Sequence, residues 1–195
     1  YAVVVTNIEY DHPDYFKDLE STVGSFKKLC EKVSEGGFVV LNADDQGCKK
    51  LLEQSANLQI CRLKKYGRDS ELFRALTLQI PGEFNRYNAT AAGRAAIALG
   101  VPRPAVEKVA REFKGVWRRF EIVGELHDSR FIIHDSPIII SDYGHHPTAI
   151  RATMRAAREF YPGRRLVLVY QPHQHSRTKR LFNDFVEVLK DAADL

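Results

Sequence analysis

Several features are scarce or missing in this sequence. Its 195 residues include only three cysteines, Cys30, Cys48 and Cys61, and their spacing matches no metal-binding pattern. An odd, widely spaced set argues against a disulfide framework and favours a reducing compartment. No apolar run is long enough to span a bilayer, and no secretion signal opens the chain. We therefore expect a cytoplasmic bacterial protein, and both ends of the chain read as cut from a longer one.

The glycine-rich loops that bind nucleotide phosphates are also missing. Neither G-x-x-x-x-G-K-[ST] nor G-x-G-x-x-G occurs, so a nucleotide site built from these residues alone lacks its main phosphate cradle. The net charge of +4 is too small to indicate nucleic acid, and no DNA- or RNA-binding motif is present. A weakly basic surface suits anionic small-molecule substrates. We expect no nucleic acid, no membrane and no obligate protein partner.

What remains is the pattern of an α/β protein. In the first part, apolar strand-like runs alternate with helical apolar stripes, which favours βαβ units and a mainly parallel sheet. The expected strands lie at residues 2–7, 38–41, 58–63 and 76–80. The expected helices open near Pro13 and cover residues 48–54, 88–99 and 104–113.

The pattern changes near residue 115. Residues 120–125 and 131–134 predict an antiparallel pair. A new strand–helix–strand–helix run follows, with strands at 138–141 and 166–170, a helix from Pro147, and a last helix that includes residues 181–189. We predict two domains, residues 1–114 and residues 115–195.

Two polar loops carry most of the chemistry. Residues 142–148 (DYGHHPT) and residues 171–178 (QPHQHSRT) each follow an apolar run. Loops after neighbouring parallel strands meet at the carboxyl edge of a sheet, where ligands bind. We therefore expect one crevice to bring together the side chains of Asp142, His145, His173 and Arg177.

Each of these side chains also has a simpler explanation. Asp142 could bind a ribose hydroxyl or cap a helix. His145 could act as a base or hold a carboxylate, or it could be merely exposed beside a helix-capping His146. A guanidinium at Arg177 can clamp a carboxylate through two parallel bonds. The same ambiguity applies to the imidazoles of His173 and His175.

Two further pairs of polar side chains are candidate ligand contacts, one at the start of the alanine-rich helix and one at the predicted domain junction. Asn85 and Asn88 offer amides that suit the edge of a purine base, although N-capping explains Asn85 equally simply. Arg118 and Arg119 could bridge phosphates, and a solvated basic turn is the simpler alternative.

Two metal sites are conceivable. His12 could bind a hard metal with oxygen ligands from Glu9 and Asp11, although polar residues are common where a strand ends. A zinc-type hydrolase site would instead need a set of four imidazoles, those of His145, His146, His173 and His175. Neighbouring histidine side chains usually diverge, which makes this the weaker hypothesis.

Six blocks of sequence, taken in order, resemble the Mur ligases, and most of all the branch that adds L-alanine to UDP-N-acetylmuramate. The blocks are residues 7–16 (NIEYDHPDYF), 42–45 (NADD), 81–89 (PGEFNRYNA), 115–121 (GVWRRFE), 142–148 and 171–173 (QPH). The resemblance implies the later part of a P-loop-type central ATPase domain followed by most of a Rossmann-like C-terminal domain. The sequence departs from the family pattern at Phe84, where a histidine is usual. The stretch between Leu63 and Pro81 is also much shorter than is usual in the family.

The resemblance also implies an activity and a set of roles. The family uses ATP and Mg²⁺ to form an acyl phosphate that an amine then attacks. By resemblance His12 is a magnesium ligand, Asn85 and Asn88 contact adenine, Arg119 and Arg118 lie near the phosphates, and Asp142 contacts the ribose. The amino-acid pocket then holds Tyr143, His145, His173 and Arg177, with His145 also catalytic. A tripeptide-recycling ligase and a non-catalytic nucleotide-binding module are the alternatives, and this chain alone is expected to be inactive.

Overall fold

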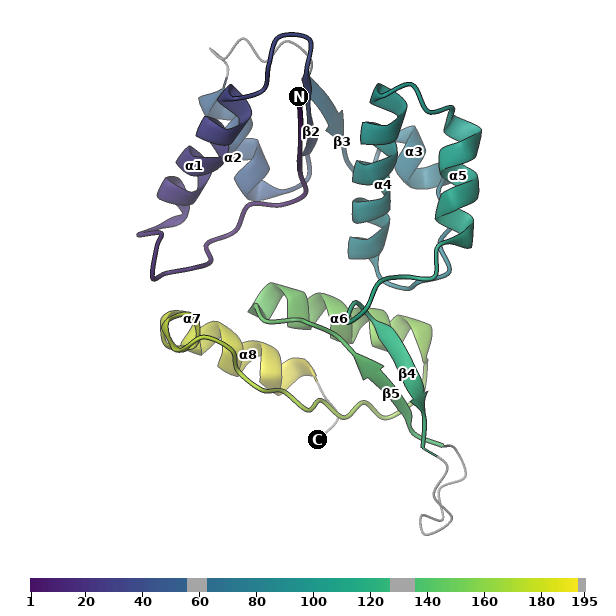
Figure 1. The fold of residues 1–195 in the computed structure, drawn as a ribbon. Helices are drawn as coiled ribbons and strands as arrows, with labels where there is room; N and C mark the ends of the chain where they lie inside the picture. The colour runs from purple at the N-terminus through teal and green to yellow at the C-terminus, as the bar shows by residue number, and fades with distance from the viewer. Residues whose placement is uncertain (56–62, 127–135, 193–195) are drawn as a thin grey trace.

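The computed structural model describes residues 1–55, 63–126 and 136–192, which form two halves joined by a short linker (Figure 1). The first half contains a parallel sheet in the order β1-β2-β3. Its strands are β1 (Ala2–Val5), β2 (Phe38–Asn42) and β3 (Leu63–Tyr66). The expected strand at residues 58–63 lies largely outside the described residues, and β3 begins at its end.

Helices cover both faces of this sheet. Alternate residues of β2 point to opposite sides, and all five residues of the strand are buried. Val39 and Leu41 pack against α1 (Leu19–Glu31) and α2 (Gln46–Gln54), whereas Phe38 and Val40 pack against α4 (Glu83–Ala98). This three-layer arrangement confirms the predicted α/β class.

The helix expected to open near Pro13 begins later, at Leu19. Asp18 caps it by accepting a hydrogen bond from Ser21 N at 2.8 Å, and Ser21 Oγ accepts one from Asp18 N in return. This capping box stabilises a start at Leu19, because it satisfies backbone donors that the first turn leaves free. The prediction was wrong here, and residues 6–17 form a long loop instead.

The expected strand at residues 76–80 is also wrong. A short helix, α3 (Glu71–Ala75), precedes it, and Leu76 and Leu78 pack against α4 and α5 (Arg103–Glu112). Their alternation therefore reflects helix packing. The alanine-rich helix α4 begins at Glu83, five residues before the expected start, because Gly82 adopts a φ of 93° and supplies the N-cap.

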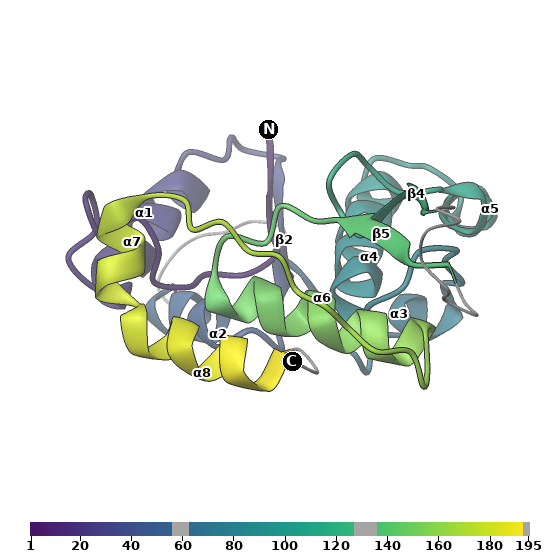
Figure 2. The ribbon, with the colours of Figure 1, turned by 90° about the horizontal axis from the view of Figure 1, so that it is seen from below.

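The second half contains an antiparallel pair, β4 (Glu121–Glu125) and β5 (Ile138–Ser141). The predicted partner at residues 131–134 lies outside the described residues. Three helices follow, α6 (Pro147–Phe160), α7 (His175–Arg180) and α8 (Phe182–Ala192). α6 and α8 run side by side, as Figure 2 shows.

Two details differ from the prediction for this half. In the expected strand at residues 166–170, burial alternates along the chain. Leu166, Leu168 and Tyr170 pack against the α6–α8 core, and Val169 is 93% exposed. The segment nevertheless belongs to neither sheet in the described part of the chain. The last helix is broken at Leu181, which ends α7.

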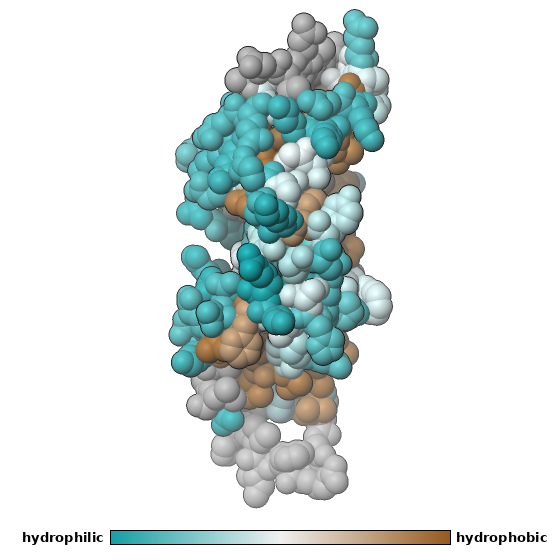
Figure 3. Space-filling model, turned by 90° about the vertical axis from the view of Figure 1, so that its left-hand side faces the viewer, coloured by the Kyte–Doolittle hydropathy of each residue, from teal (hydrophilic) through white to brown (hydrophobic). Residues whose placement is uncertain are grey.

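The halves meet along α6, which lies on the side of the second half that faces the first (Figure 1). Phe84 of α4 packs against Phe120, Ala156 and Ala157 of the second half. None of the described helices has the length and apolar character needed to cross a bilayer. On the face shown in Figure 3, hydrophilic residues cover most of the first half, and apolar residues gather in the second.

Candidate functional site

The loop after β1 is held firmly where it leaves the sheet. Ile8 is buried, and its N–H donates to Asp45 Oδ1 at 3.0 Å. The same oxygen accepts from Cys48 N at 2.8 Å and so caps α2. Gly47 lies directly against Ile8, since a Cβ at Gly47 would come within 2.0 Å of Ile8 O. This anchor fixes the point from which the loop projects toward the second half.

An ion pair between the halves forms the centre of the candidate site. Arg177 Nε lies 2.5 Å from Asp11 Oδ1, and Arg177 Nη2 lies 3.2 Å from Asp11 Oδ2. Arg177 Nη1 donates to His173 O at 3.2 Å. The arginine side chain is only 3% exposed and the Asp11 side chain 22%, so the guanidinium of this bidentate pair is removed from water while the carboxylate keeps partial access to it.

His145 completes the cluster. Its Nε2 lies 3.5 Å from Asp11 Oδ2, and its ring meets the Tyr143 ring edge to face with centroids 5.1 Å apart. Burial, and then the positive charge of Arg177, lower the pKa of His145 despite the attraction of Asp11. The imidazole is therefore mainly neutral at neutral pH, and its contact with Asp11 is a weak polar contact rather than an ion pair.

The pKa of Asp11 shifts the other way. Burial of the carboxylate favours its protonated form, but hydrogen bonds from Arg177 and from the backbone of His12, with the Arg177 charge, outweigh burial. The net result lowers the pKa of Asp11 to about 2. Asp11 is therefore a permanent anion at the junction of the halves.

Adjacent residues add contacts between the same loops. The ring of His146 accepts from Thr148 N at 3.4 Å and caps α6, which confirms that interpretation. The same ring lies 3.4 Å from Glu9 Oε2, and its Nε2 is 3.3 Å from Tyr10 O. His145 is not merely exposed beside it, because both rings contact the loop after β1.

The predicted crevice forms only in part. His145 and Arg177 come together, but the side chain of His173 is exposed and only its carbonyl oxygen joins the cluster. Asp142 Oδ2 accepts from Phe120 N at 2.9 Å, and Oδ1 accepts from Gly144 N at 2.7 Å. Asp142 therefore ties the linker to the loop after β5, and its interpretation as a helix cap was wrong because His146 caps α6.

Sequence reasoning missed the acidic partner of Arg177. It assigned Asp11 to a metal site with His12, whereas Asp11 closes the contact between the halves. The sequence did contain a signal for this contact, because residues 9–14 are acidic, residues 173–180 are basic, and opposite charges attract. Gln174 Nε2 also donates to Asp14 Oδ1 at 2.7 Å, so the two segments meet over several residues.

No metal site is assembled within the described residues. No three histidine, cysteine, aspartate or glutamate side chains there lie close enough to hold an ion, and all four loop histidines are among those residues. The hydrolase hypothesis therefore has no support. His12 is 57% exposed and lies 3.8 Å from Asp11 Oδ2, so these residues do not by themselves fit a magnesium ion.

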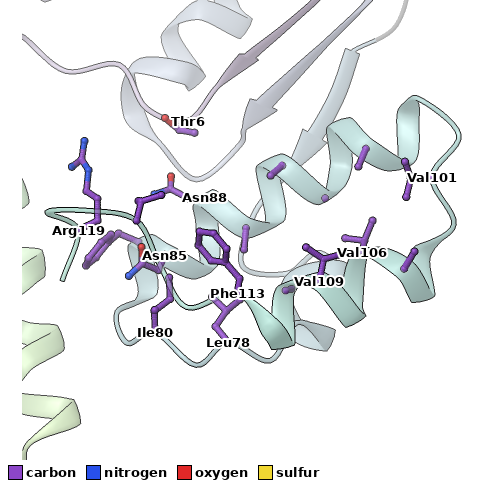
Figure 4. Close-up of a pocket in the computed structure, with 18 of the residues that line it drawn as sticks. Thr6, Leu78, Ile80, Asn85, Asn88, Val101, Val106, Val109, Phe113 and Arg119 are labelled. Carbon is purple, nitrogen blue, oxygen red and sulfur yellow. The ribbon is translucent and has the colours of Figure 1, made fainter. Parts of the chain in front are cut away.

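A cavity of about 710 Å³ opens between the end of β1, helices α4 and α5, and the linker. Its polar groups come from Thr6, Asn7, Asn85, Asn88 and Arg119, and most of the remaining wall is apolar. Asn88 extends from α4 toward Thr6 (Figure 4). Such a mainly apolar slot with a few polar groups is typical of a small-molecule site.

The amide of Asn85 is only partly available to a ligand. Its Nδ2 donates to Pro81 O at 2.6 Å, and Gly82 is the N-cap, so the capping explanation for Asn85 was wrong. This bond uses one N–H of the amide and leaves its carbonyl oxygen and second N–H for a ligand. Phe84 also lines the cavity and so takes part in its wall as an apolar group.

The linker arginines pack on aromatic rings. The Arg118 guanidinium lies 5.4 Å from the Trp117 ring centroid and 4.8 Å from that of Tyr143. Arg119 lies 5.9 Å from the Tyr143 ring and also lines the cavity. Arg118 is therefore more than a solvated basic turn, and Tyr143 connects the arginine pair to His145.

Comparison with known proteins gives consistent relatives. Residues 1–96 match the Mur ligase middle domain, and residues 118–195 match the Mur ligase glutamate ligase domain. A UDP-N-acetylmuramate–L-alanine ligase from Caldicellulosiruptor bescii is 36% identical over 96% of this chain and 44% of its own length. One of the same name from Nitrosomonas europaea is 38% identical over 97% of the chain and 45% of its own length. The chain thus spans less than half the length of these curated relatives.

Solved structures agree on the fold. A UDP-N-acetylmuramate–alanine ligase from Thermotoga maritima has a TM-score of 0.62 at 24% identity, covering 97% of this chain and 49% of that one. A protein named MurF from Acinetobacter baumannii has a TM-score of 0.72 at 16% identity, covering 100% of this chain and 44% of that one. With both domain profiles matched and curated relatives above 35% identity along nearly its whole length, the chain belongs to the Mur ligase family.

Proposed function

We propose that the chain is part of a cytoplasmic ATP-dependent ligase that joins L-alanine to UDP-N-acetylmuramate through an acyl phosphate, releasing ADP and phosphate. The names of the curated relatives support this substrate pair. Within the structure, the observation that carries the proposal is the buried Arg177 beside a neutral His145. We further propose that residues 1–114 belong to the central domain and residues 115–195 to the C-terminal domain.

Arg177 and His145 suit the amino-acid half of the reaction. A guanidinium with paired N–H groups binds a carboxylate bidentately, which would hold L-alanine by its acid group. Tyr143 and His173 would line the same pocket. The amine must lose a proton to become a nucleophile, and the lowered pKa of His145 keeps its ring able to accept one.

In the second step of the proposed reaction, the amine of L-alanine attacks the acyl phosphate. The amine nitrogen forms the new C–N bond to the carbonyl carbon of the acyl phosphate, and the C–O bond to phosphate breaks with its electron pair. The proton lost by nitrogen goes to the free ring nitrogen of His145. His145 therefore acts as a general base, a role that typically contributes about 10²–10⁴-fold in rate.

The cavity suits the nucleotide half. ATP, when bound, supplies the phosphoryl group that activates the muramoyl carboxylate. The amides of Asn85 and Asn88 would contact the adenine edge, and Asp142 would contact the ribose through lone pairs that its two backbone hydrogen bonds leave free. Arg119, supported by the stacked Arg118, would bind the phosphates. Mg²⁺, when bound, would offset the negative charge of the phosphates, and it would need ligands in addition to His12.

The chain alone should not turn over ATP, because its sequence has no glycine-rich phosphate loop. The test of the proposal therefore uses the complete protein and measures phosphate release with UDP-N-acetylmuramate and either L-alanine or a murein tripeptide. Release that depends on L-alanine supports the proposal. Release that depends on the tripeptide supports a recycling ligase, and no release with either supports a non-catalytic module.

A matched pair of variants tests the role of Arg177. Arg177→Gln should raise the KM for L-alanine by at least about 100-fold, because it removes charge-assisted hydrogen bonds worth about 3 kcal/mol together. The KM for ATP should change less than about threefold. Arg151→Gln is the control, since Arg151 forms an exposed ion pair with Glu187 away from the site. An unchanged KM for L-alanine in Arg177→Gln would exclude the carboxylate clamp.

A further inference from the structure

Asp11 presents to Arg177 the same group that the proposed substrate would present. A carboxylate of the chain makes two bonds to the guanidinium, through Nε and Nη2. The same carboxylate is also the nearest acid group to His145, at 3.5 Å. An amino acid held by Arg177 with its amine near His145 would place its own carboxylate in this position.

The two carboxylates cannot occupy that position together. The paired donors of Arg177 at Nε and Nη2 are used by Asp11, and Nη1 already donates to His173 O. With the arginine side chain only 3% exposed, an incoming acid has no open path to the remaining donors. Two unscreened carboxylates at one guanidinium would also repel each other. Arg177 can therefore bind a substrate only after Asp11 moves away.

We propose that Asp11 is an internal ligand of the carboxylate subsite, and that the incoming amino acid binds by displacing it from Arg177. This inference rests on the proposed function, because it assumes that Arg177 receives the substrate carboxylate. Displacement breaks the central contact between the loop after β1 and the second half. Substrate binding and loop release are thereby the same event.

The rest of the loop is built so that it can leave. Residues 9–14 contain no helix or strand. Besides Asp11, they contact the second half through the side chains of Glu9 and Asp14 and through Tyr10, whose carbonyl oxygen lies 3.3 Å from His146 Nε2 and whose ring lies under Arg180. His12 adopts a φ of 53°, and the Asp11 carboxylate accepts its backbone N–H at 2.7 Å. A histidine in this conformation costs free energy, which release of the loop would recover. The anchor at Ile8 precedes residues 9–14 and does not involve Arg177, so it stays in place.

Competition by Asp11 also selects among ligands. A simple carboxylate such as acetate must displace an acid that is already tethered at high effective concentration, and it gains nothing in exchange. An amino acid has a further contact to gain at His145. The internal carboxylate therefore favours ligands that carry both an acid and an amine.

The experiment measures binding of L-alanine to this full 195-residue chain by calorimetry or NMR titration. Asp11→Asn removes the competing charge and should lower the Kd for L-alanine about tenfold. The matched control is Asp14→Asn, which changes the same charge on the same loop but lies beside Gln174 rather than Arg177, and it should alter the Kd less than twofold. An unchanged or weaker affinity in Asp11→Asn overturns the inference, because a carboxylate that only supports Arg177 would have that effect.

Arg177→Gln separates this inference from the proposed function. If Arg177→Gln loses binding and Asp11→Asn gains none, displacement is excluded while the clamp survives. If Arg177→Gln binds as the parent does, the clamp fails and the inference fails with it. If neither the parent nor Asp11→Asn binds L-alanine, displacement is likewise excluded, since the variant should unmask the subsite.

A second measurement needs no variant. Amide hydrogen exchange of residues 9–14 in the parent chain should speed up several-fold at saturating L-alanine, because the loop loses its main contact. Acetate at the same concentration should leave the exchange rates unchanged. Slower exchange with L-alanine would show that the ligand tightens the loop and would exclude displacement.

Discussion

Asp45 offers a quantitative test of how the loop after β1 is held. Its Oδ1 accepts two backbone hydrogen bonds, from Ile8 N and from Cys48 N, and both donors belong to buried residues. Asp45→Ala removes both bonds at once. The variant therefore uncaps α2 and frees the start of the loop in a single step.

The expected cost follows from the two contacts. Loss of an aspartate N-cap typically costs about 1 kcal/mol. The N–H of Ile8 would be left buried without an acceptor, which adds about 1–3 kcal/mol. We expect Asp45→Ala to lower the free energy of unfolding by about 2–4 kcal/mol.

Urea unfolding followed by circular dichroism measures this change. With an m-value of about 2 kcal/mol/M, the midpoint should fall by about 1–2 M. Asp45→Asn is the control, because its amide oxygen still accepts both bonds, and its midpoint should move by less than about 0.4 M. A loss below about 0.5 kcal/mol in Asp45→Ala, or equal losses in both variants, would refute the anchoring role.

Three further predictions test other parts of the structure. Gly47→Ala should cost at least about 2 kcal/mol in the same urea assay, because the added Cβ meets Ile8 O at 2.0 Å; a neutral result would contradict the close approach. NMR titration should give Asp11 a pKa of about 2, rising in Arg177→Gln as burial then dominates. Since that pKa lies below the usual 3.8, the contact with Arg177 stabilises the folded chain above about pH 4, and this stabilisation is lost as the pH falls through about 2. Equal pKa values of Asp11 in the parent and in Arg177→Gln would exclude the ion pair. Ala92→Phe fills the cavity and should weaken ATP binding by about tenfold in the complete protein, with L-alanine use unchanged, whereas unaltered ATP binding would place the nucleotide elsewhere.

Local pattern was enough to predict most of the fold. β1 and β2 are continuous apolar runs that are visible in a window of a few residues, and helices on both faces of the sheet bury every residue of β2. The start of α1 was misplaced because an apolar residue, Phe16, extends the helical stripe backwards. The capping signal at Asp18 and Ser21 was the better guide.

The site depends on longer-range contacts. Arg177 and His145 were predicted as ligand-binding residues from the loops they occupy, and the structure does bring them together. Their shared partner Asp11 is 166 positions from Arg177, and no local periodicity relates the two. Only the opposite charges of the two segments pointed to the contact, and charge alone does not specify which residues pair.

The linker has a consequence for how the halves respond to a ligand. Gly115, Arg118 and Phe120 all adopt positive φ values, of 100°, 56° and 49°. For the two non-glycine residues this conformation is unfavourable by about 1–2 kcal/mol each, so it is maintained by the ring stack of Arg118 on Tyr143 and by the hydrogen bond from Phe120 N to Asp142. The conformation of the linker is thus supported in part by the Tyr143 ring, which also touches His145. A ligand that displaces this ring would remove the stack on Arg118 and with it part of the support for the two unfavourable φ values.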